Sequence, residues 1–248
     1  MDIPADDPLI QRIKAARFFM LRYETEFTPC TGITAVTRQE RRHFKGGIMI
    51  APWCPALKRS KPEDDPLVNG SVRKTDWSFK VNGLDCHVLV STDAFAPLLF
   101  LAVESRFYGV KTPYDLPVSD LHSDTFYFAL AVDELLRQVG SPRQFVWGGD
   151  WETVPALWLV RERHTTALTL HNTFDECLAV ESLQFGDTFS AFAENRGDSP
   201  FQKTALEVGL ETADVVTTVN RGFAWGMRRE PIQTRVMAQH LQHLISRV

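Results

Sequence analysis

The stretch that decides the fold is Phe145–Asn172, FVWGGDWETVPALWLVRERHTTALTLHN, whose pattern is typical of a strand, a turn, a helix and a second strand. The first strand, 145–147, leads into a Gly-Gly-Asp turn at 148–150. The second strand, 167–170, ends in a His-Asn pair at 171–172. Because ligands bind at the carboxyl ends of parallel strands, both polar groups lie at the edge of the sheet where a binding site is expected.

The segments before this stretch predict further strands and one long helix. Short apolar runs predict strands at 16–23, 47–51, 77–81, 86–90 and 98–103. Asn82-Gly83 predicts a hairpin, which adds antiparallel strands to the sheet. We expect loops at 24–37, which is rich in threonine, and at 52–70, which is rich in proline. Apolar residues at helical spacing predict a helix from Ser119 to about Val139.

The segments after this stretch alternate between helix and strand. We expect a helix at 203–212, a buried strand at 214–219, and helices at 221–228 and 232–245. The polar segment 185–200 is typical of a long functional loop or a mobile insertion. This alternation predicts an α/β fold with a doubly wound, mostly parallel sheet. We expect residues 1–248 to form a single domain.

Charge and composition exclude several classes of partner. A net charge of -4 gives no bulk attraction to nucleic acid or to an anionic membrane. No apolar run approaches the roughly 20 residues that cross a bilayer, and the start of the chain lacks a secretion signal. We therefore expect no membrane partner and a cytoplasmic location. The basic cluster at 38–45 is interpreted as a solvated helix face.

The common cofactor and nucleophile motifs are missing from the sequence. It contains no GxGxxG dinucleotide fingerprint, no GxxxxGK[ST] phosphate loop and no GxSxG elbow. The four cysteines are scattered without CxxC spacing, so we expect reduced thiols and no metal site. These observations disfavour cofactor-dependent redox chemistry and nucleotide hydrolysis.

Several motifs together resemble the amino-terminal half of glycogen and starch synthases. Asp150-Trp151 opens a helix as in that family, and Thr169–Asn172 keeps the family's Thr-x-His-Asn strand end. Ala213–Asn220 resembles the family's Ala-Asp-x-(Ile/Val)-Thr-x-Val-Ser strand, and Tyr114-Asp115 its Tyr-Asp segment. In the glycine-rich loop, 30–36, only Thr31, Gly32 and Ala35 match.

The resemblance implies a Rossmann-like, amino-terminal, acceptor-side domain of a GT-B glycosyltransferase, with the second GT-B domain absent from this chain. The family transfers glucose from ADP-glucose or UDP-glucose to an α-glucan. It implies no cofactor beyond this nucleotide-sugar substrate, which is bound together with the second domain, and an α-glucan or oligosaccharide acceptor. The isolated chain is then expected to be inactive.

The resemblance also assigns roles to individual residues. It implies that His171 and Asp150 are catalytic. It implies substrate contacts from Thr31, Gly32, Tyr114, Trp151, Asn172 and Asn220. Each has a simpler interpretation: Gly32 is typical of a turn and Trp151 of core packing. Asp150 is favoured as a helix N-cap, and His171 fits a structural hydrogen bond equally well.

Two departures from the family fall on residues that it uses for the reaction. The family's loop lysine, which helps bind the donor phosphates, is Cys30 here, and a histidine near the transferred sugar is Gly149. Neither residue supplies the missing charge or contact. The alternative interpretation is therefore a non-catalytic glycosyltransferase-like module that binds glycan or a protein partner.

Overall fold

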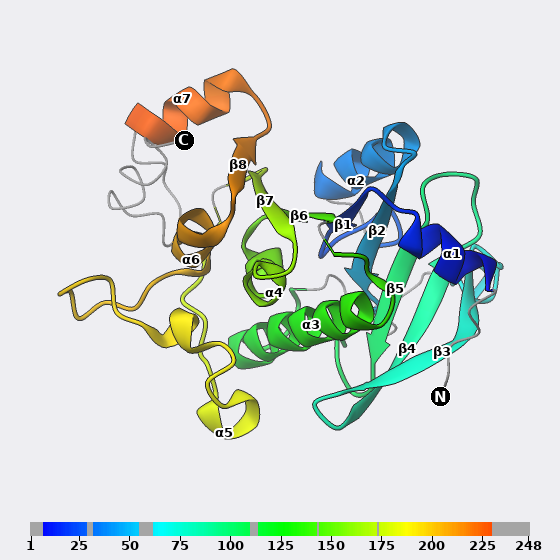
Figure 1. Ribbon diagram of the computed structural model, residues 1–248, viewed down its shortest axis with the longest axis horizontal. Coiled ribbons are helices and arrows are strands. Elements are labelled where there is room, and N and C mark those ends of the chain that lie inside the picture. The colour runs from blue at the N-terminus through cyan, green and yellow to red at the C-terminus, as the bar shows by residue number, and fades with distance from the viewer. Residues whose placement is uncertain are drawn as a thin grey trace.

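The computed structural model describes residues 7–28, 32–54, 62–109, 114–142, 144–172 and 174–229. These residues form one eight-stranded sheet with the order β3-β4-β5-β2-β1-β6-β7-β8 (Figure 1). The parallel strands are β1 Phe18–Leu21, β2 Gly47–Pro52, β5 Leu98–Val103, β6 Phe145–Gly149, β7 Thr165–Leu170 and β8 Val215–Thr218. The predicted mostly parallel sheet is therefore confirmed.

An antiparallel hairpin extends one edge of the sheet. β3 Val72–Val81 and β4 Leu84–Ser91 pair with each other, and β4 also pairs antiparallel with β5. The turn between them places Asn82 at φ 46° and Gly83 at φ 85°. Positive φ at both central residues is the requirement of a two-residue hairpin turn, which Asn-Gly meets without strain. The predicted hairpin is thus confirmed.

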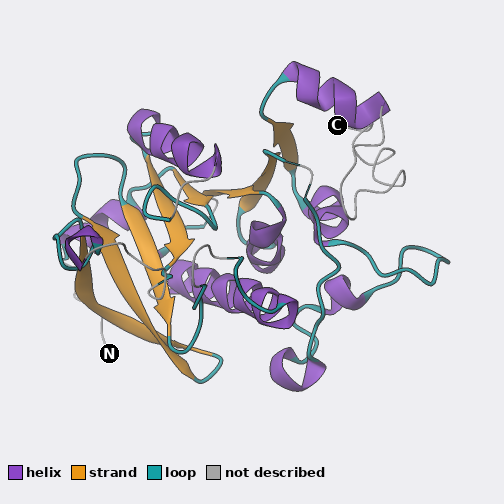
Figure 2. Ribbon diagram, turned by 180° about the vertical axis from the view of Figure 1, so that it is seen from behind, coloured by secondary structure: helices purple, strands orange, loops and turns teal. Residues whose placement is uncertain are grey.

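The helices lie on both faces of the sheet. They are α1 Pro8–Lys14, α2 Gly32–His43, α3 Val118–Val139, α4 Val154–Val160, α5 Ser182–Phe185, α6 Ala205–Thr212 and α7 Arg221–Arg229, with short 3-10 turns η1 Pro62–Asp64, η2 Trp151–Thr153 and η3 Ser190–Ala193. The connection from β1 to β2 runs one way along the sheet, and that from β5 to β6 runs the other way. Right-handed crossovers in opposite directions place α2 and α3 on opposite faces, and Figure 2 shows the sheet from the side away from α3.

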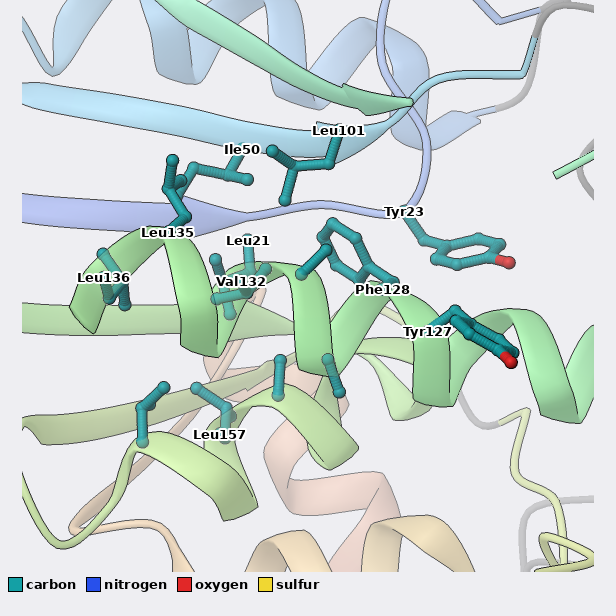
Figure 3. Packing of buried hydrophobic residues seen from close by; sticks show 14 of the residues in the cluster. Leu21, Tyr23, Ile50, Leu101, Tyr127, Phe128, Val132, Leu135, Leu136 and Leu157 are labelled. Atoms are coloured by element: carbon teal, nitrogen blue, oxygen red, sulfur yellow. The ribbon is translucent and has the colours of Figure 1, made fainter. Parts of the chain in front are cut away.

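Alternating strand residues build two hydrophobic clusters. Leu21, Ile50 and Leu101 face α3, where they pack against residues that include Val132 and Leu135 (Figure 3). Met20, Met49 and Phe100 point to the other face and form a second, smaller cluster. Successive strand side chains alternate between faces, so burial on both faces explains why these strands are continuously apolar.

The start of α2 corrects the expectation of a loop at 24–37, because the helix already begins at Gly32. Its buried face carries polar side chains, including Thr34 and Thr37, so tertiary contacts override the weak helix propensity of threonine. The interpretation of 38–45 as a solvated face is wrong for Arg41, which is 0% exposed. Its guanidinium binds both carboxylate oxygens of Asp93 at 2.7 and 2.9 Å and pairs with Glu26.

Two expectations in the second half of the chain also change. The strand predicted at 214–219 is present as β8, but its prediction as a buried strand is wrong, because β8 is an edge strand whose residues are exposed or half-buried. The polar segment 185–200 carries Phe189 and Phe192, which are buried against Phe126 of α3. Aromatic rings spaced along this segment therefore anchor it to the core, in place of a mobile insertion.

Some expectations fall outside the described residues. They concern Cys30, Thr31, part of the loop at 52–70 and the helix at 232–245. In the part of the chain that the structure describes, no helix combines the length and apolar character that crossing a membrane requires.

Candidate functional site

The carboxyl ends of β6 and β7 bring Asp150 and His171 together. These strands are adjacent and parallel, so the residues that follow them meet at one edge of the sheet. Asp150 Oδ1 accepts hydrogen bonds from the backbone N–H groups of His171 at 2.8 Å and Asn172 at 3.3 Å. Asp150 Oδ2 lies 3.1 Å from His171 Nδ1. Both side chains are largely buried, with 7% of His171 and 5% of Asp150 exposed.

The backbone at Asp150 corrects the expectation that this residue caps the following helix. It adopts φ 58° and ψ -178°, and its side chain makes no capping hydrogen bond. The carboxylate binds the His171 and Asn172 region instead, and the Thr153 hydroxyl donates to the Gly149 and Asp150 carbonyls at 3.1 Å. This φ/ψ region is almost restricted to glycine and costs a residue with a side chain about 1–3 kcal/mol. Strain of this kind clusters at functional sites.

The pair lies at the topological switch point of the sheet. Connections run from β1 toward β2 on one side, whereas β6 and β7 continue on the other side. The crevice outside the strand ends at such a point is where open α/β sheets bind ligands. The chain that follows β1 therefore lies at the same edge of the sheet as Asp150 and His171.

Acidic and phenolic groups lie beside these strand ends. The Tyr114 side chain hydrogen bonds to Glu24, just after β1, and to Glu152, and its ring stacks on Tyr23 with centroids 6.1 Å apart. Burial, followed by the charge of Asp150, raises the pKa of Glu152 well above its ordinary value. Burial also raises the pKa of Tyr114, and Glu152 and Glu24 add to this effect. The tyrosine hydroxyl therefore stays protonated and keeps its single O–H donor.

A buried arginine completes the site. Arg22 follows β1 directly and is 1% exposed. Its Nε and Nη2 donate to the Glu40 carboxylate of α2 at 2.8 and 2.7 Å. Its Nη1 donates to the Leu21 and Trp147 carbonyls at 2.8 and 3.2 Å. The guanidinium carbon lies 4.6 Å from the Trp147 ring centroid, which gives a cation–π contact.

Similarity to known proteins fits this geometry. The family model of the starch synthase catalytic domain matches residues 48–246. The chain belongs to this family. No curated protein sequence matches the chain.

Solved structures support the same fold. The chain is 15% identical to the catalytic domain of starch synthase IV from Arabidopsis thaliana bound to ADP and acarbose, with a TM-score of 0.64 over 94% of this chain. It spans 49% of the length of that starch synthase chain. A trehalose-6-phosphate protein from E. coli bound with UDP-2-fluoro glucose is 14% identical over 84% of this chain and 40% of its own, but its TM-score of 0.37 carries no weight.

Of the other predicted site residues in this starch synthase family member, Asn172 adjoins the Asp150–His171 pair, and its Oδ1 accepts from Phe174 N at 2.8 Å. Trp151 is 4% exposed and packs edge-on against His122, so it offers no open face to a sugar ring. Asn220 Oδ1 accepts from Phe223 N at 2.8 Å, where α7 begins. Gly32 is the first residue of α2.

Arg22, Glu24 and Glu152 are contributors that the sequence-based prediction missed. Arg22 lies at the end of the expected strand 16–23, Glu24 follows it, and Glu152 is two residues from Asp150. Strand-end position was the signal that could have found them. A separate cavity of about 400 Å³ lies between Glu26, Arg38 and Phe95, and no predicted site residue lines it.

Proposed function

We propose that this chain is the amino-terminal, acceptor-side domain of a nucleotide-sugar glucosyltransferase that uses ADP-glucose or UDP-glucose and an α-glucan acceptor. The observation that carries the proposal is the Asp150–His171 pair at the switch point of a sheet in a starch synthase family member. In this proposal residues 1–248 are one domain and work in the cytoplasm, and a second domain supplies the nucleotide pocket.

The proposed reaction forms one bond and breaks another. The oxygen of an acceptor hydroxyl bonds to the anomeric carbon of glucose, the bond from that carbon to the diphosphate oxygen breaks, and the hydroxyl proton is released. The His171 Nδ1–H donates to Asp150, which leaves Nε2 to hydrogen bond a sugar hydroxyl. A carboxylate that orients a histidine ring in this way fixes its tautomer. Asp150 thus positions the imidazole that contacts the sugar.

The surroundings of the pair suit a sugar better than a phosphate. The acidic side chains of Glu24, Asp150 and Glu152 lie around the pair and offer no positive charge to a diphosphate. The guanidinium of Arg22 is occupied by Glu40 and two carbonyl groups. This charge balance supports an acceptor-side role, with the positive charge for the diphosphate coming from the second domain.

The rival function is a non-catalytic module that binds glycan or a protein partner. Its support is the replacement of two reactive side chains of the family by Cys30 and Gly149. It predicts glycan or partner binding without glucosyl transfer.

The test uses the protein as its native source produces it, after its intact mass is compared with the 28.1 kDa of this chain. Release of nucleoside diphosphate is measured with ADP-glucose and with UDP-glucose, each in the presence of glycogen. We expect release that His171→Ala reduces roughly a hundredfold or more, whereas His87→Ala, at an exposed position on β4, leaves it unchanged. No release with either donor would favour the non-catalytic module and refute the proposal.

A further inference from the structure

The space beside Gly149 is already filled by two functional side chains. A Cβ atom at this position would lie 3.1 Å from Arg22 Nη1 and 3.1 Å from His171 Cε1. Both distances are shorter than ordinary van der Waals contacts of a Cβ atom, which begin at 3.4 Å. The guanidinium and the imidazole therefore border the same small volume next to the Gly149 Cα atom.

Arg22 is not free to leave this volume. Its side chain is 2% exposed and that of Glu40 is 9% exposed, so the ion pair is buried. Moving the guanidinium away would leave the Glu40 carboxylate buried without its partner, which is strongly unfavourable. The hydrogen bonds of Nη1 to the Leu21 and Trp147 carbonyls tie the same group to the ends of β1 and β6. These contacts hold the guanidinium in one position beside Gly149.

The opposite restraint on His171 comes from Asp150. The carboxylate holds Nδ1 at 3.1 Å and the His171 backbone N–H at 2.8 Å, whereas Cε1 borders the volume that Arg22 closes. The ring is thus held by a hydrogen bond at Nδ1, and its Cε1 edge borders the same space beside Gly149 as the Arg22 guanidinium.

We propose that Arg22 is a positioning residue for His171, and that Arg22 and Gly149 form a matched pair in which the guanidinium occupies the room that a side chain at position 149 would need. Position 149 must then be glycine so that Arg22 and His171 can both keep their places. The inference rests on the proposed role of His171 in sugar binding, but the arrangement itself can be tested without a donor or an acceptor.

The neighbouring glycine offers a matched control. A Cβ atom at Gly148 would meet Thr153 Oγ1 at 2.5 Å and Leu157 Cδ1 at 2.8 Å. Gly148 lies in the same strand as Gly149 but faces Thr153 and Leu157, and no atom of Arg22 is among its three nearest neighbours. Alanine at position 148 therefore serves as a packing control for stability, because it displaces Thr153 and Leu157 in place of Arg22.

The first experiment is a double-mutant cycle of stability, measured by urea unfolding. Gly149→Ala and Gly148→Ala are each made in the native protein and in a background with Arg22→Ala and Glu40→Leu, which leaves no unpaired ionised group. We expect Gly149→Ala to lower the folding equilibrium constant about fivefold or more in the native protein and to have a much smaller effect in the altered background. Gly148→Ala should have the same effect in both. Equal effects of Gly149→Ala in the two backgrounds would refute the matched pair.

The second experiment measures the placement of the His171 ring. Proton–nitrogen correlation spectra of the protein with ¹⁵N-labelled histidine report the tautomer and order of each ring, and His171→Gln identifies the His171 signals. We expect Gly149→Ala and Arg22→Lys, which loses the paired hydrogen bonds to Glu40, both to shift or broaden these signals. Gly46→Ala, whose Cβ atom would lie 3.5 Å from Arg17 Cδ in ordinary contact, should leave them unchanged. Unchanged His171 signals in Gly149→Ala and Arg22→Lys would overturn the positioning role. Because neither readout uses glucosyl transfer, an inactive protein could still confirm this inference.

Discussion

The Asp150→Gly variant should be more stable than the Asp150→Ala variant, which reverses the usual order of glycine and alanine. Asp150 has φ 58° and ψ -178°, a region that costs a residue with a Cβ atom about 1–3 kcal/mol. Alanine keeps this strain, whereas glycine removes it and loses about 0.5–1 kcal/mol through the extra freedom of the unfolded chain. Asp150→Gly should therefore unfold with a free energy up to about 2.5 kcal/mol higher than that of Asp150→Ala.

Both variants should be less stable than the native protein. The carboxylate accepts hydrogen bonds from His171 N, His171 Nδ1 and Asn172 N. At about 0.5–1.5 kcal/mol each, their loss costs Asp150→Ala about 1.5–4.5 kcal/mol, and Asp150→Gly recovers part of this. Under the proposed function, both variants should also lose sugar binding and transfer, because the His171 imidazole loses its anchor in either one. Relief of strain would then restore stability without function.

The assay is equilibrium urea unfolding of the two variants, with the same pair of substitutions at Asp133 as a control. Asp133 lies inside α3, where alanine should be about 1 kcal/mol more stable than glycine. An alanine variant at position 150 that equals or exceeds the glycine variant in stability would show that the backbone there is not strained, and would refute the reasoning.

Three further predictions concern the scaffold. Arg41→Met should lower the unfolding free energy by about 1–3 kcal/mol, because it leaves the Ala96 carbonyl and the partly exposed carboxylates of Glu26 and Asp93 without their donor; a loss below about 1 kcal/mol in urea unfolding would contradict this. Burial raises the pKa of Asp175 to about 7. The folded state therefore favours the protonated acid, and the unfolding free energy should fall as pH rises from about 4 to about 7, by at most about 4 kcal/mol. In urea titrations over this range Asp175→Asn should flatten the fall, and an equally steep fall would exclude Asp175 as its source. Phe126→Ala should cost about 3–5 kcal/mol, because its ring lies 4.4 Å from that of Phe189, and should make the segment 185–192 sensitive to protease; an unchanged cleavage rate would contradict the packing of that segment.

The sequence predicted that Asp150 and His171 lie at the ends of neighbouring strands. His171 and Asp150 are 21 residues apart, but parallel neighbouring strands joined by a helix bring their carboxyl ends together. The contact of the pair could therefore be expected from the pattern alone. The way Asp150 uses its carboxylate could not, because an aspartate before a helix usually caps it, and only the backbone conformation at φ 58° decides against the cap.

The sequence by itself determined the elements that local patterns encode. Continuous apolar runs specify strands that are buried on both faces, Asn82-Gly83 specifies the hairpin turn, and helical spacing specifies α3. Tertiary structure alone decided the burial of Arg41, the exposure of β8 and the placement of Arg22 beside Gly149. Arg22 and Trp147, for example, are 125 residues apart. Which charge finds a distant partner, and which strand lies at an edge, depends on how the whole chain packs, and no local pattern records it.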